Sequence, residues 1–233
     1  MKSLLILAGC ISAAASPVAL ANQGISGKHE TAVPDSYLAR LGTAAPTFLI
    51  ERLQDPLNEK NYRGVVERLE WESKGMPRED QRIFTGLSRF IGRNMERDEV
   101  LPDTEAAMDD AMMIIGSRGG EAGVNYLIEW VTTDKYIKSV RCHDRFTRDP
   151  EQFAVRLLKR GVRGLGLSGK PKALEVLKKL KADPPKIRYF NKSVENAIDF
   201  AISENLQIQK DGPEKYFFPA PSSNYKPQKP KGP

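Results

Sequence analysis

The sequence predicts an all-α protein, an α-solenoid in which about four antiparallel helix pairs stack on one another. Apolar residues recur at helical spacing along most of the chain, and no run of alternating polar and apolar residues is long enough to predict a strand. Glycine-containing turns separate several of these helical segments. An irregular helical bundle, in which the glycine pattern is coincidental, remains the alternative.

Residues 1–21 have the pattern of a signal peptide. Lys2 supplies the positive start, Leu4 to Ile11 form the apolar stretch, and Ala19-Leu20-Ala21 is a small-x-small cleavage site before Asn22. A lipobox-like sequence ending at Cys10 leaves a second hypothesis open, a lipoprotein anchored at that cysteine. Either pattern predicts an exported protein of the periplasm or the extracellular space, with no transmembrane segment because the apolar run is too short.

The mature chain of about 212 residues is divided into a polar leader over 22–36, a helical repeat domain over 37–210 and a tail over 211–233. Breaks are predicted at Asp55-Pro56, Gly75-Met76-Pro77 and Leu101-Pro102, since proline disfavours helix in the residue before it. Helices are predicted over Glu105–Ile115 and Glu121–Val131. Other helices are predicted around apolar positions at helical spacing, which are Phe48, Leu49, Leu53; Tyr62, Val65, Val66, Leu69; Ile83, Phe84, Leu87, Phe90, Ile91; and Val194, Ala197, Ile198, Ala201, Ile202.

The stretch Phe153–Ala182 predicts two amphipathic helices joined by a tight glycine turn. Gly166 and Gly169 bracket the predicted turn and can adopt positive φ, and Pro171 suits the first turn of the second helix. Each helix has one apolar face that the pair alone cannot cover. The pair is therefore expected to stack on similar pairs.

A pattern of a branched apolar residue, then glycine, then an apolar residue twelve positions after the first occurs three times. It is found at Leu41-Gly42…Leu53, Ile115-Gly116…Leu127 and Leu165-Gly166…Leu177. The last two blocks lie about fifty residues apart, near the period of HEAT-type repeats. The segment from Gly164 to Leu177, GLGLSGKPKALEVL, resembles the turn and second helix of a bacterial HEAT-like repeat. Lys170 departs from the acidic residue that such repeats usually carry before the proline. The resemblance covers about thirty residues and implies an α-solenoid.

The end of the chain changes composition. Six of the sixteen prolines lie in residues 211–233, together with lysines and serines, which predicts a disordered tail. Its apolar element is Tyr216-Phe217-Phe218. That element is expected to dock on the helical body, and docking on a partner is the alternative.

Charge is distributed unevenly. Residues 96–134 have a net charge of −8 and residues 135–192 a net charge of +12. In a stacked array this predicts an acidic end and a basic end, through which copies of the chain could associate weakly. The residues predicted to bind a partner are Arg156, Lys159, Arg160, Arg163, Lys172, Lys178, Lys179 and Lys181. The alternative is that these residues only form a solvated face.

Motifs with catalytic chemistry are weak. The G-x-G-x-x-G match over 164–169 lacks a preceding strand, so it does not predict a dinucleotide site. Cys142 has no internal disulfide partner once Cys10 leaves, and is expected to be buried, with an intermolecular disulfide as the alternative. The acidic pairs Glu70/Glu72 and Asp109/Asp110 do not differ from solvated carboxylates. No metal site and no cofactor are predicted.

These features predict a non-catalytic, exported binding or scaffold module. Its basic C-terminal half is expected to bind another protein or an anionic envelope polymer. Nucleic acid is not expected, because the chain is exported. The HEAT-like resemblance also implies an alternative from another class, since some such proteins are lyases or attach chromophores; a glycan-acting enzyme of the periplasm would suit the basic half.

Overall fold

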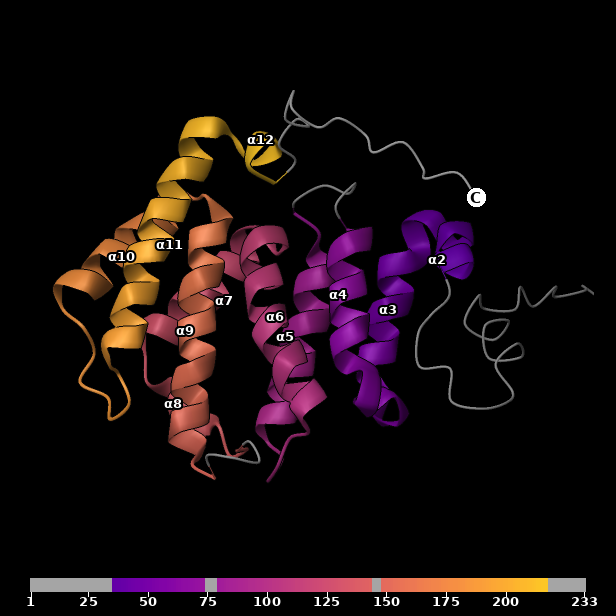
Figure 1. Ribbon diagram of the computed structural model, residues 1–233, viewed down its shortest axis with the longest axis horizontal. Helices are drawn as coiled ribbons and strands as arrows, with labels where there is room; N and C mark the ends of the chain where they lie inside the picture. The colour runs from indigo at the N-terminus through magenta and orange to yellow at the C-terminus, as the bar shows by residue number, and fades with distance from the viewer. Residues whose placement is uncertain (1–34, 74–78, 144–147, 218–233) are drawn as a thin grey trace, which may run out of the picture. The chain divides into compact units, whose positions relative to one another are not determined.

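The computed structural model describes residues 35–73, 79–143 and 148–217, which are all-helical with no strand among them (Figure 1). The predicted signal peptide, most of the predicted leader and the break at Gly75-Met76-Pro77 lie outside these ranges. The helices are α2 (Asp35–Leu41), α3 (Ala45–Gln54), α4 (Tyr62–Glu72), α5 (Gln81–Met95), α6 (Pro102–Arg118), α7 (Gly120–Thr132), α8 (Lys135–Ser139), α9 (Pro150–Ser168), α10 (Pro171–Ala182), α11 (Lys192–Asp211) and α12 (Pro213–Phe217). Two short 3₁₀ segments, Gly42–Ala44 and Pro56–Asn61, precede α3 and α4. The prediction of an all-α class is confirmed.

Helix starts follow ordinary capping chemistry. The side chains of Asp80, Asp149 and Asn191 each accept a hydrogen bond from the backbone N–H two residues on, which satisfies one of the free donors at the start of α5, α9 and α11. Proline occupies the first turn of α6, α9 and α10, where a missing N–H costs nothing. Local sequence therefore sets where these helices begin.

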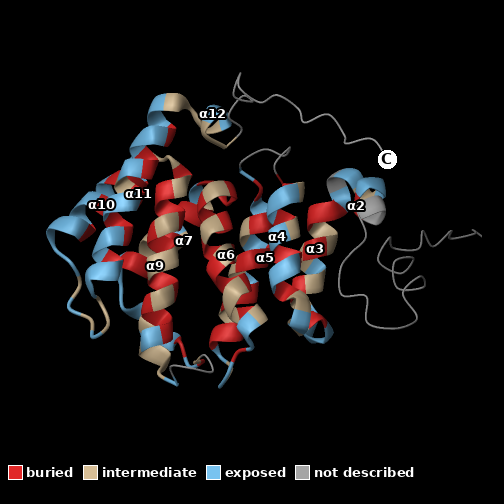
Figure 2. Cartoon of the chain, in the orientation of Figure 1, coloured by how far each residue is buried: buried red, intermediate tan, exposed pale blue. Residues whose placement is uncertain are grey.

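The helices form two rows of contacts. In one row α4, α6, α9 and α11 contact each other in that order, and in the other α3, α5, α7 and α10 do the same. The rows also contact each other, α4 with α3, α6 with α5, α9 with α7 and α11 with α10. Buried residues continue through these helices, whereas exposed residues mark the outer faces of α4, α10 and α11 (Figure 2).

Helix α9 packs against both neighbours in its row at very short range. A Cβ on Gly164 would lie 2.6 Å from the carbonyl oxygen of Met112 in α6, and a Cβ on Gly166 would lie 2.8 Å from the Cα of Ala201 in α11. Glycine lowers helix propensity, but here its missing side chain lets three backbones approach. Gly166 was expected to bracket the turn, and it lies instead inside α9.

The turn after α9 is formed by Gly169, whose φ of 63° ends the helix in the left-handed region, as predicted. Leu165 and Leu177, on either side of this turn, are fully buried. Gly116 likewise lies inside α6, and the turn after it uses Gly120, with φ of 60°. Gly42, by contrast, lies in a 3₁₀ turn before α3, so the first of the three glycine blocks differs in structure from the other two.

The predicted disordered tail begins with an ordered helix. Residues 213–217 form α12, which contacts α11. The Tyr216 hydroxyl donates to Glu204 Oε1 over 2.9 Å, and the guanidinium of the buried Arg118 lies 5.9 Å from the Phe217 ring centroid. The expected docking on the helical body is therefore seen for Tyr216 and Phe217, while Phe218 lies outside the described residues.

Candidate functional site

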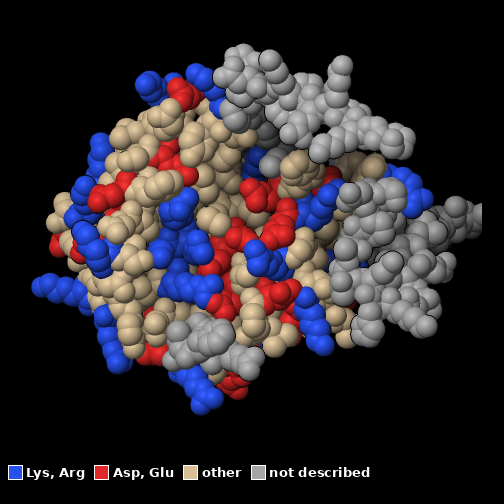
Figure 3. Space-filling view, viewed as in Figure 1, with Lys and Arg blue, Asp and Glu red and all other residues tan. Residues whose placement is uncertain are grey.

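The arginines of α9 contact carboxylates of neighbouring helices. Arg156 Nη2 lies 2.7 Å from Asp109 Oδ2, and Arg160 Nε lies 3.2 Å from the same oxygen. Arg156 also forms an ion pair with Glu105, one turn before Asp109 on α6. We call Glu105, Asp109, Arg156 and Arg160 the α6–α9 seam. On the face in Figure 3, Lys and Arg side chains over α9 lie directly beside Asp and Glu side chains over α6.

This arrangement corrects the expected separation of charge. The acidic residues of α6 were predicted to lie at one end of the array and the basic residues of α9 at the other. Although α7 and α8 lie between them in the chain, α6 and α9 pack directly against each other, and their charges pair across this contact. Arg163 is engaged in the same way, 3.5 Å from Glu204 of α11.

Asp109 is not an ordinary solvated carboxylate, contrary to the sequence-based expectation. Only 2% of the residue is exposed, and burial raises the pKa of Asp109 to about 6 although Arg160 acts to lower it. Its Oδ2 accepts from Arg156 Nε and Nη2, whereas Oδ1 is buried and has no hydrogen-bond partner among the described residues. Burial also raises the pKa of the adjacent Asp110. Removing the Asp109 carboxylate from water at the α6–α9 seam therefore carries a desolvation penalty that its ion pairs must offset.

The lysines of the predicted binding set fall into two groups. Lys159 donates to Ser193, Lys172 to Asn125, and Lys181 forms an ion pair with Asp199. The side chains of Lys178 and Lys179 on α10 are exposed and make no hydrogen bond or ion pair with the residues that the structure describes. Lys178 and Lys179 are therefore the lysines of the predicted binding set whose charge remains available to a partner.

Lys179 borders a hollow of about 660 Å³ formed by the end of α7, by α10 and by the segment after it. Its apolar lining consists of Val131, Val176, Leu180, Pro184 and Pro185, and Lys186 and Asp183 are its other charged residues. The exposed Lys186 also lacks a side-chain partner within the described ranges. We call this hollow the α10 groove.

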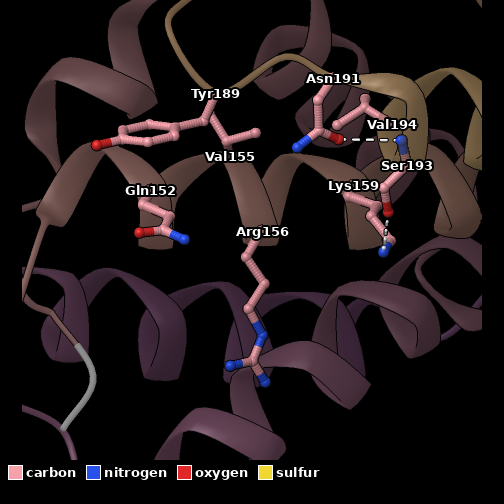
Figure 4. A pocket seen from close by; sticks show the side chains of 8 residues that line it. All are labelled: Gln152, Val155, Arg156, Lys159, Tyr189, Asn191, Ser193 and Val194. Carbon is pink, nitrogen blue, oxygen red and sulfur yellow. Dashed lines mark hydrogen bonds between the residues drawn. The ribbon is translucent and has the colours of Figure 1, made fainter. Parts of the chain in front are cut away.

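A second hollow, of about 240 Å³, lies between α9 and the start of α11 (Figure 4). Several of its polar groups are already occupied: Lys159 donates to Ser193 Oγ, and Asn191 Oδ1 accepts from the Ser193 N–H. The Arg156 side chain extends away from Tyr189 and Asn191 in Figure 4, toward the seam. This hollow therefore offers a ligand few unpaired polar groups.

The cysteine, the methionines of α6 and the two tryptophans differ in how far they are buried. Cys142 is fully buried, as expected, and burial raises the pKa of its thiol to about 12. Met108 and Met112 are core residues of α6. Trp130 is buried and Trp71 is exposed. Within the described ranges, no three His, Cys, Asp or Glu side chains are placed to hold a metal ion.

The pairing of Glu105 and Asp109 with α9 was not predicted from the sequence, where Asp109 was expected to be an ordinary solvated carboxylate, and Lys186 was not singled out. A signal for the first two existed, because Glu105 and Asp109 are four residues apart, as are Arg156 and Arg160. Such spacing puts each pair on one helix face, but it does not say that the two faces meet. Lys186 had no local signal, since it belongs to an irregular segment.

Comparison of the chain with known protein families, with curated proteins and with solved structures found no match. None of the helices in the described ranges is both long and apolar enough to span a membrane.

Proposed function

We propose that the chain is a HEAT-like α-solenoid of four helix pairs, α3–α4, α5–α6, α7–α9 and α10–α11. The two rows of contacts support this proposal, because each pair contacts the next pair along the chain. In such an array the terminal pairs open independently of the middle ones. Amide hydrogen exchange tests the proposal: graded protection from the ends inward supports a solenoid, and one common opening rate supports an irregular bundle.

As its function we propose an exported, non-catalytic binding module for an acidic protein partner. The observation that carries the proposal is the pair Lys178 and Lys179, whose charges remain unpaired among the described residues while the arginines of α9 pair with carboxylates. Exposed cations beside a hollow raise the local concentration of anionic partners. An anionic envelope polymer is the competing ligand.

The test is capture of partners from envelope extract by the chain starting at Asn22. Binding through exposed lysines should weaken as salt rises, because the Debye length shortens from about 10 Å at 0.1 M to about 3 Å at 1 M. The double variant Lys178→Glu/Lys179→Glu should lose the partner. The control Lys60→Glu/Lys210→Glu changes the net charge by the same amount at two exposed lysines elsewhere, and it should still bind the partner.

Capture that is the same for both double variants at every salt concentration would contradict the proposal. Loss of capture after protease treatment of the extract indicates a protein partner, and loss after removal of anionic polymer indicates the competing ligand. Sedimentation of the mature protein at low salt separates either result from self-association. Intact mass of the native protein tests export with cleavage before Asn22 against a lipidated form beginning at Cys10.

A second candidate function rests on Asp109. A carboxyl group with a pKa raised to about 6, beside Glu105 and two arginines, has the acid strength of a general acid or base. Because only 2% of Asp109 is exposed, a substrate would reach this carboxyl only after α6 and α9 separate. The corresponding activity is cleavage of an acidic glycan in the periplasm. Product formation from acidic polysaccharides by the wild-type chain, abolished in Asp109→Asn, would establish it, and absence of product would exclude it for the polymers tested.

A further inference from the structure

We infer that the α10 groove binds an extended segment of the partner protein, one that carries acidic side chains next to apolar ones. This inference rests on the proposed binding function and names the place and chemistry of the contact.

The apolar surface of the groove comes from two helices and a rigid segment. Val131 at the end of α7 and Leu180 on α10 are buried beneath the hollow, so its accessible apolar surface comes mainly from the half-buried Val176 and from the two prolines that follow α10. Pro184 and Pro185 line the same hollow. Proline has a fixed φ, so this part of the lining loses little conformational freedom when a ligand binds. Apolar side chains of a partner would remain in contact with water unless they entered such a hollow.

The charges of the groove favour an acidic ligand. Lys179 and Lys186 come from different segments and neither side chain has a partner among the described residues. Asp183 contributes one opposing charge, and Lys178 adds a further exposed cation one residue from Lys179. A partner carboxylate would therefore gain attraction without breaking an ion pair within this chain. Binding at the seam would require breaking existing ion pairs, such as Arg156–Asp109.

A second hollow borders the α10 groove. This hollow, of about 280 Å³, shares Leu180 and Pro184 with the groove and is lined beyond them by Phe190 and Ile198. There the lysines are paired, Lys181 with Asp199 and Lys192 with Glu195. A segment that spans both hollows would place its acidic positions at the Lys179 and Lys186 end and its apolar positions toward Phe190.

The probe is a random ten-residue peptide library displayed on phage and selected against the full mature chain at low salt. The expected result is enrichment of sequences that combine Asp or Glu with Leu, Ile, Val or Phe. A labelled selected peptide should bind Lys179→Glu/Lys186→Glu at least about tenfold more weakly, since the charges it contacts are reversed. It should bind Lys60→Glu/Lys210→Glu as it binds the wild type. All four lysines are exposed, so thermal unfolding of both variants should match the wild type.

Selected peptides without acidic residues, or equal binding to the groove variant, would overturn the inference. So would retention of the envelope partner by Lys179→Glu/Lys186→Glu, a result that leaves the binding module intact with its contact elsewhere. If the wild-type chain captures no envelope partner at all, the proposed function itself fails. A small anionic molecule that saturates the groove and does not compete with selected peptides would also contradict a peptide-binding site.

Discussion

Gly116 of α6 and Gly164 of α9 meet backbone to backbone, so closely that a Cβ on Gly116 would overlap the carbonyl group of Gly164. The atom in the way belongs to the main chain, which cannot rotate aside as a side chain can. The two helices that carry the α6–α9 seam are therefore held at a distance that only glycine permits.

This contact predicts that Gly116→Ala destabilises the protein. The added methyl group must separate α6 from α9, and overpacking of this kind costs about 1–3 kcal/mol or more. Urea unfolding followed by circular dichroism measures the change. Gly64→Ala is the matched control, because Gly64 is exposed in α4 with nothing within 4 Å of its Cβ position, and alanine there should stabilise by about 0.5–1 kcal/mol. Equal effects of the two substitutions would show that α6 and α9 are not packed this closely.

The buried carboxyl of Asp109 predicts a pH dependence of stability. Its pKa of about 6 in the folded protein lies above its ordinary value of 3.8, so the native state binds this proton more tightly than the unfolded chain does. The contribution of Asp109 to the free energy of unfolding therefore decreases as pH rises from about 4 to about 6, by on the order of 2–3 kcal/mol. Asp109→Asn should remove this component.

The measurement is urea unfolding of the wild type and Asp109→Asn at several pH values between 4 and 7. The wild-type free energy of unfolding should fall relative to that of the variant as pH rises. Glu175→Gln, at an exposed position of α10, controls for the loss of one carboxylate. Parallel curves for the wild type and Asp109→Asn would mean that Asp109 is not protonated preferentially in the folded state.

Cys142 should be unreactive in the folded protein. Its thiol is fully buried and has a pKa raised to about 12, so almost no thiolate is available at neutral pH. In the chain starting at Asn22, where it is the single cysteine, reaction with an aromatic disulfide reagent should be at least about a hundredfold slower in buffer than in concentrated urea. Rapid labelling of the folded chain, or a disulfide-linked dimer on a non-reducing gel, would contradict the buried position.

The glycine turn predicts a large effect of core truncation on either side of it. Leu165 and Leu177 are fully buried, and replacing either by alanine should cost about 2–5 kcal/mol of unfolding free energy. Leu206, which is exposed on α11, provides the control, since Leu206→Ala should change stability by less than about 0.5 kcal/mol. Denaturation midpoints that hardly move for the two core variants would show that α9 and α10 are not packed through these residues.

Helix positions could be predicted from the sequence because their causes are local. The apolar spacing of Ile83, Leu87 and Phe90, for example, lies within one helix, and each of these residues is buried. The turn at Gly169 follows from a residue type that tolerates positive φ. Helix α12 was missed because five residues provide less than two turns of periodicity, and its position depends on Glu204 and Arg118, which lie elsewhere in the chain.

The all-α class, most helix positions and the basic character of the stretch from 135 to 192 follow from local sequence alone. Which of those charges remain available to a partner depends on how the helices pack. Arg156 and Asp109 are 47 residues apart, and their pairing depends on two glycines that let α6 and α9 touch. Lys179 and Lys186 remained unpaired among the described residues because no carboxylate of a packed neighbour reaches them. Side-chain spacing along one helix is a local property, whereas the partner of a charge is chosen by helix packing, which the periodicity of a single segment does not encode.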